Sequence, residues 1–471
     1  MALDDPEFLR FSANRLISSY VKHELSPVEV VEACIRRIER LNPRFHIYIG
    51  VLAEDALSGA RKAERAYIRG MARGILEGLP VSVKDVFAAE GGPTTWGLKE
   101  LAQYAPGHDS TVVTRLRQEG AILLGKTNVD TYPYQGPPGS PRLIGPTPNP
   151  WDPKRTAGRS SGGSAASVAA CFDYGSIGSD LGGSIRIPAA FCGVVGLLPT
   201  FGLVSNFGAF PYSKSFDHCG PIARSVEDCA LLLRALAGHD PKDPLTVKRA
   251  VPDYTQIAGP IQGLRVGVPR PTAWPMNQPD VTRLVDGAIE SLVNLGVEVR
   301  EIEMPYYREA RWVVTVGILE TTNLTEGMHQ RQVPPDPFAA VMLARALAGR
   351  ERLIEQGMQI RRAARSRYAD IFRDIDVIAT PTVATTAPLL TEDNSTWQLP
   401  DEPYAELIAR HTILFNLIHH PAISVPCGFG NDRMPVGLQL ATRPFEEETL
   451  FRVAYAYERE TGWHAMFPTM S

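Results

Sequence analysis

The chain lacks several features that would assign it to a specialised class of protein. It has no long run of like charges, and 48 Lys and Arg residues nearly balance 52 Asp and Glu residues, so the formal net charge is −4. Such a mixed, nearly neutral composition argues against nucleic acid or an anionic membrane as the main partner. The six cysteines are scattered and form no Cys-x-x-Cys pair. We therefore expect buried thiols in a reducing compartment, with neither disulfides nor a zinc site.

A signal peptide and a membrane span are also absent from the sequence pattern. The first residues, MALDDPEFLRF, are acidic and lack a basic stretch followed by an apolar one. Residues 187–213 carry no charge and are long enough to cross a bilayer, but three prolines and four glycines interrupt them. A single apolar helix does not tolerate that pattern, so buried strands and loops are expected there. The sequence predicts a soluble, cytoplasmic protein.

Helical and strand patterns alternate along the whole chain. Residues 26–43 begin with Ser-Pro, repeat apolar residues at intervals of three and four, and end in Asn42-Pro43, which predicts a capped helix. Residues 79–87 are typical of a buried strand, and the alternation continues to a closing helix near the C-terminus. The pattern predicts α/β layers in one domain over residues 1–471. Residues 303–375 are richer in arginine and helical patterns, and we expect a more variable region there.

Two short motifs have competing interpretations. Residues 120–127, GAILLGKT, match the phosphate-binding pattern G-x-x-x-x-G-K-[ST], but four apolar residues after a helix predict a core strand instead. Residues 158–162, GRSSG, match the G-x-S-x-G elbow of α/β-hydrolases, with Ser160 as nucleophile. A loop with two prolines, rather than a hydrophobic strand, precedes Ser160. An ordinary glycine-serine turn therefore stays equally open.

The segment GSDLGGSIRIPA, residues 178–189, is typical of an anion-binding loop. Gly182 and Gly183 allow a close approach of the backbone, and consecutive inward N–H groups can hold the oxyanion of a tetrahedral intermediate. Ser184 would then be the attacking hydroxyl, although a plain tight loop explains the motif equally well in isolation. Lys84 ends a predicted strand and is either solvent-facing or a buried base with a lowered pKa.

Taken together, these segments resemble the amidase signature family. The resemblance is densest over residues 78–233 and returns in FNLIHHPAISVPCGF and MPVGLQL. Ser160 and Ser184 stand 24 residues apart, the interval that this family keeps between its two serines. The resemblance implies a single-domain α/β/α sandwich with a large mixed, mostly parallel central sheet flanked by helices.

The resemblance also implies a catalytic relay that requires no metal and no cofactor. Ser184 would be the nucleophile, Ser160 the bridging serine next to an unusual cis peptide bond, and Lys84 the terminal base. Backbone N–H groups would hold the oxyanion, and two charged side chains would support their loop. The oxyanion-binding residues would be Leu181, Gly182, Gly183 and Ser184, and the supporting residues Asp180 and Arg186.

Two places depart from the family pattern. Arg159 stands where the family commonly has glycine, so its side chain either meets a polar or acidic part of the substrate or points away. Residues 131–147 are richer in proline and aromatic residues than the usual family loop. We expect this loop to line the pocket entrance, with Tyr132, Pro133 and Tyr134 nearest to the substrate.

The leading hypothesis is a stand-alone amidase that hydrolyses a small carboxylic amide, or an ester, hydrazide or anilide. Its closest rival is the glutaminase subunit of a tRNA-dependent amidotransferase. That subunit usually has Gln where this chain has Ile187, and a Ser-Asn-Leu helix that is not evident near residues 321–324. An inactive binding homologue is a third hypothesis, and nucleotide binding through residues 120–127 is the remotest. The family resemblance further suggests a homodimer.

Overall fold

The computed structural model describes residues 5–72, 74–130, 143–210, 213–269, 277–317, 319–320, 349–390 and 408–470. Within these ranges, eleven strands form one sheet. The strands are β1 (Tyr48–Val51), β2 (Pro80–Lys84), β3 (Ile122–Thr127), β4 (Ser176–Asp180), β5 (Val195–Leu198), β6 (His218–Ala223), β7 (Arg265–Pro269), β8 (Glu298–Ile302), β9 (Val377–Pro381), β10 (Ala422–Phe429) and β11 (Pro435–Ala441). Their order across the sheet is β1-β3-β2-β4-β6-β5-β10-β11-β9-β7-β8.

The sheet is mixed, as the sequence predicted, but the expectation of a mostly parallel sheet is wrong. Parallel pairing occurs in β3–β2 and β2–β4 on one side and in β9–β7 and β7–β8 on the other. The strands between these regions pair antiparallel, and so does β1 with β3. One cause is the β10–β11 hairpin, which is inserted between β5 and β9, because a short turn can join only antiparallel strands.

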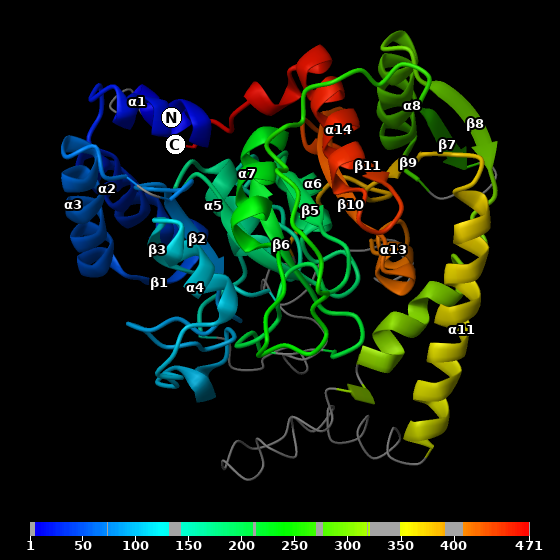
Figure 1. The fold of residues 1–471 in the computed structure, drawn as a ribbon, viewed down its shortest axis with the longest axis horizontal. Coiled ribbons are helices and arrows are strands. Elements are labelled where there is room, and N and C mark those ends of the chain that lie inside the picture. The colour runs from blue at the N-terminus through cyan, green and yellow to red at the C-terminus, as the bar shows by residue number, and fades with distance from the viewer. Residues whose placement is uncertain are drawn as a thin grey trace.

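Helices flank this sheet, and the long α11 lies at the end of the molecule remote from α2 and α3 (Figure 1). The helix α13 packs against α11 and contributes residues to the site described below. The helices are α1 (Ala13–Val21), α2 (Pro27–Phe45), α3 (Ala53–Ile68), α4 (Thr111–Gln118), α5 (Gly162–Ala169), α6 (Arg186–Cys192), α7 (Val226–Leu236), α8 (Pro279–Asn294), α11 (Arg350–Ile371), α13 (Ile413–Ile418) and α14 (Glu447–Thr461).

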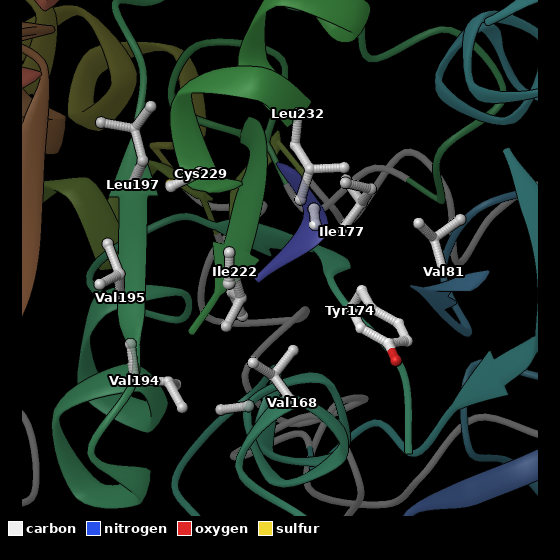
Figure 2. Close-up of a cluster of buried hydrophobic side chains, with 14 of the residues drawn as sticks. Val81, Val168, Tyr174, Ile177, Val194, Val195, Leu197, Ile222, Cys229 and Leu232 are labelled. Carbon is white, nitrogen blue, oxygen red and sulfur yellow. The ribbon is translucent and has the colours of Figure 1, made fainter. Parts of the chain in front are cut away.

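A dense apolar core supports the central strands. Figure 2 shows Ile177 of β4 and Ile222 of β6 between side chains of α5 and α7, namely Val168 and Leu232. These four side chains are fully buried. Burial of one such side chain stabilises the fold by about 1.5–3 kcal/mol. Since β4 ends at the nucleophile loop, this core fixes the point from which the loop departs.

The predicted helix over residues 26–43 is confirmed at its start but not at its end. Ser26 caps α2, and its Oγ accepts the N–H of Val28 at 3.0 Å. The helix then continues through Pro43 to Phe45 and ends at His46, which has a φ of 48°. Proline removes one N–H and crowds the carbonyl one turn earlier. In the last turn of α2, that cost does not end the helix.

Other expectations are confirmed. Residues 122–127 of the phosphate-loop match form the buried strand β3. All six cysteines are free and buried. The uncharged segment contains the short helix α6 and the strand β5, and no helix in the described ranges has the length and apolar character needed to cross a membrane.

Candidate active site

Lys84 lies at the end of β2 and is completely buried. Its Nζ is 2.6 Å from Ser160 Oγ and 2.8 Å from Ser179 Oγ. Burial lowers the pKa of Lys84 to about 7, although the negative charges of Asp180 and Asp217 act in the opposite direction. Because the pKa is close to neutrality, a large fraction of the amine is unprotonated at neutral pH and can accept a proton.

Ser160 stands immediately before α5 and follows a cis peptide bond with Arg159. Its carbonyl oxygen accepts the N–H of Asp130 at 3.1 Å. The next residue, Ser161, donates its N–H to the carbonyl oxygen of Ser184 at 3.1 Å. This backbone contact joins the segment that carries Ser160 to the loop that carries Ser184.

The nucleophile loop connects β4 to α6. Gly183 has a φ of 123° and donates its N–H to Asp180 Oδ1 at 2.6 Å. Ser184 is half-buried, as are Leu181 and Gly182. Among the described residues, the structure records no acceptor for the N–H groups of these three. They fit the predicted oxyanion donors, whereas the N–H of Gly183 is committed to Asp180.

A fully buried ion pair supports this loop. Arg186 Nη2 lies 3.1 Å from Asp180 Oδ1, and Asp180 Oδ2 also accepts the N–H of Ile185 at 3.1 Å. Burial alone would raise the pKa of Asp180, but the charge of Arg186 and the hydrogen bonds hold it well below its usual range. Asp180 is therefore a carboxylate that shapes the loop, and Arg186 neutralises its charge.

Three residues that the sequence reasoning missed complete the support. Arg186 donates to the carbonyl oxygen of Thr412 at 2.9 Å, to Gln439 Oε1 at 2.9 Å and to Asn416 Oδ1 at 2.6 Å. Asn416 Nδ2 also donates to Asp180 Oδ1 at 2.9 Å. A signal did exist, because Asn416 and Gln439 stand in FNLIHHPAISVPCGF and MPVGLQL, the two late segments that carried the family resemblance.

Arg159 is buried beside a carboxylate. Its Nε lies 3.4 Å from Asp130 Oδ1, and both side chains are almost fully shielded from solvent. The guanidinium charge is thus balanced within the protein. Tyr132, Pro133 and Tyr134, which were expected at the pocket entrance, lie outside the described residues. Nor do the described residues contain three His, Cys, Asp or Glu side chains arranged to hold a metal ion.

The chain matches the family model Amidase over residues 29–451. It belongs to the amidase family. The A-type subunit of glutamyl-tRNA(Gln) amidotransferase from Gloeobacter violaceus is 38% identical to this amidase over 489 residues, which cover 98% of each chain.

Solved amidase structures are also similar over nearly the full length. A bacterial aryl acylamidase of the amidase signature family has a TM-score of 0.86 and 27% identity, and the match covers 98% of this chain and 99% of that one. The 6-aminohexanoate cyclic dimer hydrolase has a TM-score of 0.84 and 29% identity, with the same coverage of 98% and 99%. These similarities confirm the predicted family and fold.

Proposed function

We propose that this amidase cleaves a carboxylic amide through an acyl-enzyme on Ser184, with Ser160 and Lys84 as the proton relay. The carrying observation is the 2.6 Å contact between Lys84 Nζ and Ser160 Oγ, at a lysine whose pKa burial lowers to about 7. A lysine of this kind can act as a general base near neutral pH. Ser184 stands on the adjoining loop, beside three backbone N–H groups that are available to an oxyanion.

The proposed reaction has two half-reactions. Neutral Lys84 accepts the proton of Ser160, which accepts that of Ser184 while Ser184 Oγ bonds to the carbonyl carbon. The N–H groups of Leu181, Gly182 and Ser184 stabilise the oxyanion. Its collapse breaks the C–N bond, and the relay protonates the leaving amine or ammonia. Water then attacks the acyl ester through the same relay and releases the carboxylic acid.

The setting of this reaction is a separate question, and the curated relatives favour a glutaminase subunit over a stand-alone enzyme. Eight relatives named as the A-type subunit of glutamyl-tRNA(Gln) amidotransferase are 36–38% identical to this chain over 95–98% of its length. In that setting, Ser184 would release ammonia from glutamine and other subunits would use it.

Ile187 favours the stand-alone amidase. Its side chain is 2% exposed and belongs to a buried apolar cluster next to the nucleophile loop. A glutamine, which the amidotransferase subunit usually has here, would place an amide in this apolar setting at a cost of about 1–3 kcal/mol unless it found a partner. The other buried members of the cluster are Ala190, Phe191, Val383, Ala384, Ala387, Ile408, Ala409 and Met434.

The two settings differ in what the purified chain does alone. We would measure ammonia release from glutamine and from a panel of aliphatic, aryl and amino-acid amides, with Ser184→Ala as the blank. Turnover of panel amides by the chain alone supports the stand-alone amidase. Glutamine turnover only after addition of the other subunits of a bacterial glutamyl-tRNA(Gln) amidotransferase supports the glutaminase setting.

Fluorophosphonate labelling tests the chemistry itself, whatever the setting. The adduct should map to Ser184 and should be lost in Lys84→Ala. Label on Ser160 that does not depend on Lys84 would contradict the relay and favour an α/β-hydrolase elbow. Absence of both label and turnover would favour an inactive binding homologue. Light scattering on the same preparation tests the expected homodimer.

A further inference from the structure

One peptide group of the nucleophile loop is held at both ends. The carbonyl oxygen of Gly182 accepts the hydroxyl of Thr412 at 2.8 Å, and the N–H of Gly183 in the same peptide group donates to Asp180 Oδ1 at 2.6 Å. Because a peptide group is planar, the two contacts together define its orientation. The partner residues lie 232 positions apart in the sequence, on the segment before α13 and at the end of β4.

The held peptide group lies between two of the proposed oxyanion donors. The N–H of Gly182 belongs to the preceding peptide group and that of Ser184 to the following one. Glycine has no Cβ and therefore adopts a wide range of backbone angles, so a Gly-Gly sequence does not fix these donors by itself. Contacts from outside the loop must do so, and Thr412 supplies the one to the carbonyl.

The hydroxyl proton of Thr412 has two carbonyl oxygens within reach. Ala409 O lies 3.0 Å from Thr412 Oγ1, but it already accepts the backbone N–H of Thr412 at 3.0 Å and that of Ile413 at 2.9 Å. Within the described ranges, the structure records no other donor to the carbonyl oxygen of Gly182. The hydroxyl is therefore needed by Gly182 and is dispensable for Ala409.

The space around the contact matches this assignment. Thr412 is fully buried, and a Cβ at Gly183 would lie 2.2 Å from its Oγ1. Only a glycine at position 183 admits the threonine at this distance. Thr412 also accepts Arg186 Nη1 at its carbonyl oxygen, so it holds both the loop and the ion pair behind the loop.

We propose that Thr412 is a positioning residue that orients the oxyanion-binding N–H groups through the carbonyl of Gly182. This inference rests on the proposed function, because the oxyanion is that of the acyl transfer on Ser184. Thr412 contacts neither Ser184 Oγ nor the Lys84–Ser160 pair in the described structure. Its removal should therefore affect stabilisation of the transition state and leave the basicity of the relay unchanged.

The test compares two substitutions that differ in one hydroxyl. Thr412→Val removes the hydroxyl with nearly the same shape, and Thr412→Ser keeps it. Thr382→Val is the matched control, since Thr382 is also fully buried and its Oγ1 lies 2.8 Å from Ser424 Oγ. For each variant we would measure the second-order rate of fluorophosphonate labelling at Ser184, kcat and KM for an amide that the wild type hydrolyses, and the melting temperature.

Thr412→Val should slow labelling and lower kcat by about 10- to 100-fold, since direct loss of one oxyanion donor costs about 100- to 1000-fold and this loss is indirect. KM and the midpoint of the pH profile should stay at the wild-type values. Thr412→Ser should recover most of the rate, and Thr382→Val should behave as wild type.

Three results would overturn parts of this proposal. Wild-type labelling and kcat in Thr412→Val would refute the role of Thr412 and leave the proposed function standing. Losses in Thr412→Val and Thr382→Val that match their melting temperatures would show a merely structural role and refute it too. A wild type that is not labelled at Ser184 would refute the proposed function, and the inference about Thr412 would fail with it.

Discussion

At the scale of single residues, the chemistry depends on one buried amine. Lys84 is charged in water at neutral pH, and only the dry end of β2 makes its neutral form accessible. The sequence pattern VSVKD left open whether this lysine faces solvent or the interior. The distances to Ser160 and Ser179 decide for the interior, where the amine has two hydroxyl partners.

The pH profile of kcat/KM should therefore reflect Lys84. The base form is needed, so activity should rise with pH through a midpoint near 7 and reach a plateau above it. Below the midpoint the rate should fall about tenfold per pH unit, because the neutral fraction does. Lys84→Arg, which stays charged, should be about 100- to 10,000-fold less active at every pH. An unchanged profile in that variant would rule out Lys84 as the base.

At the scale of elements, α14 holds the start of α7 through a carboxyl group. Glu458 is buried and accepts the N–H of Val226, the first residue of α7, at 2.9 Å. Burial raises the pKa of Glu458 to about 8, and the nearby charge of Asp228 acts in the same direction. The protonated form fits this contact, so the ionised form weakens the packing of the two helices.

The stability of the fold should therefore fall with pH between about 4 and 8. The unfolded chain ionises Glu458 near pH 4.3, whereas the folded chain keeps the proton up to about pH 8. Glu458→Gln keeps an acceptor for Val226 and cannot ionise. Its melting temperature should exceed that of the wild type increasingly as pH rises, by an amount on the order of a few kcal/mol in free energy at pH 8.5.

Glu460→Gln provides the control for this prediction, because Glu460 is exposed on the same helix. It should leave the pH dependence of the melting temperature unchanged. A constant difference between Glu458→Gln and the wild type from pH 5 to pH 8.5 would contradict the assignment to Glu458.

At the scale of the whole molecule, the buried Asp180–Arg186 pair joins the two ends of the sequence. Asn416 and Gln439, more than 220 residues later in the chain, hold the arginine of a loop that carries the proposed nucleophile. The loop therefore cannot take its shape before the C-terminal strands are in place. Active-site geometry and global folding are coupled through this one guanidinium group.

Arg186→Met should accordingly destabilise the entire fold. It leaves the carboxylate of Asp180 buried without a counter-charge, which typically costs about 3–5 kcal/mol. Thermal melting would measure the loss. Arg362→Met is the comparison, since Arg362 and Glu355 form an exposed pair at 2.8 Å that is worth less than about 1 kcal/mol. Equal melting temperatures for the two variants would contradict the structural role of Arg186.

Local patterns in the sequence predicted much of this architecture, and long-range contacts limited the rest. Periodicity located α2 and the strand over residues 122–127, but it carries no information about which strands become neighbours. The insertion of the β10–β11 hairpin into the sheet was therefore not foreseeable. Spacing singled out Ser160 and Ser184 because they lie close in sequence. Thr412 has no such neighbour, and a buried threonine has no distinctive local pattern.

The six buried thiols have a practical consequence. Since every cysteine of the chain is shielded, a thiol-reactive dye should leave the native protein unmodified and label it only as the fold opens. The rate of dye uptake would then follow opening of the molecule without any engineered probe. Conversely, Glu460→Cys would introduce a single reactive position on α14, at which a fluorophore could report the approach of another protein.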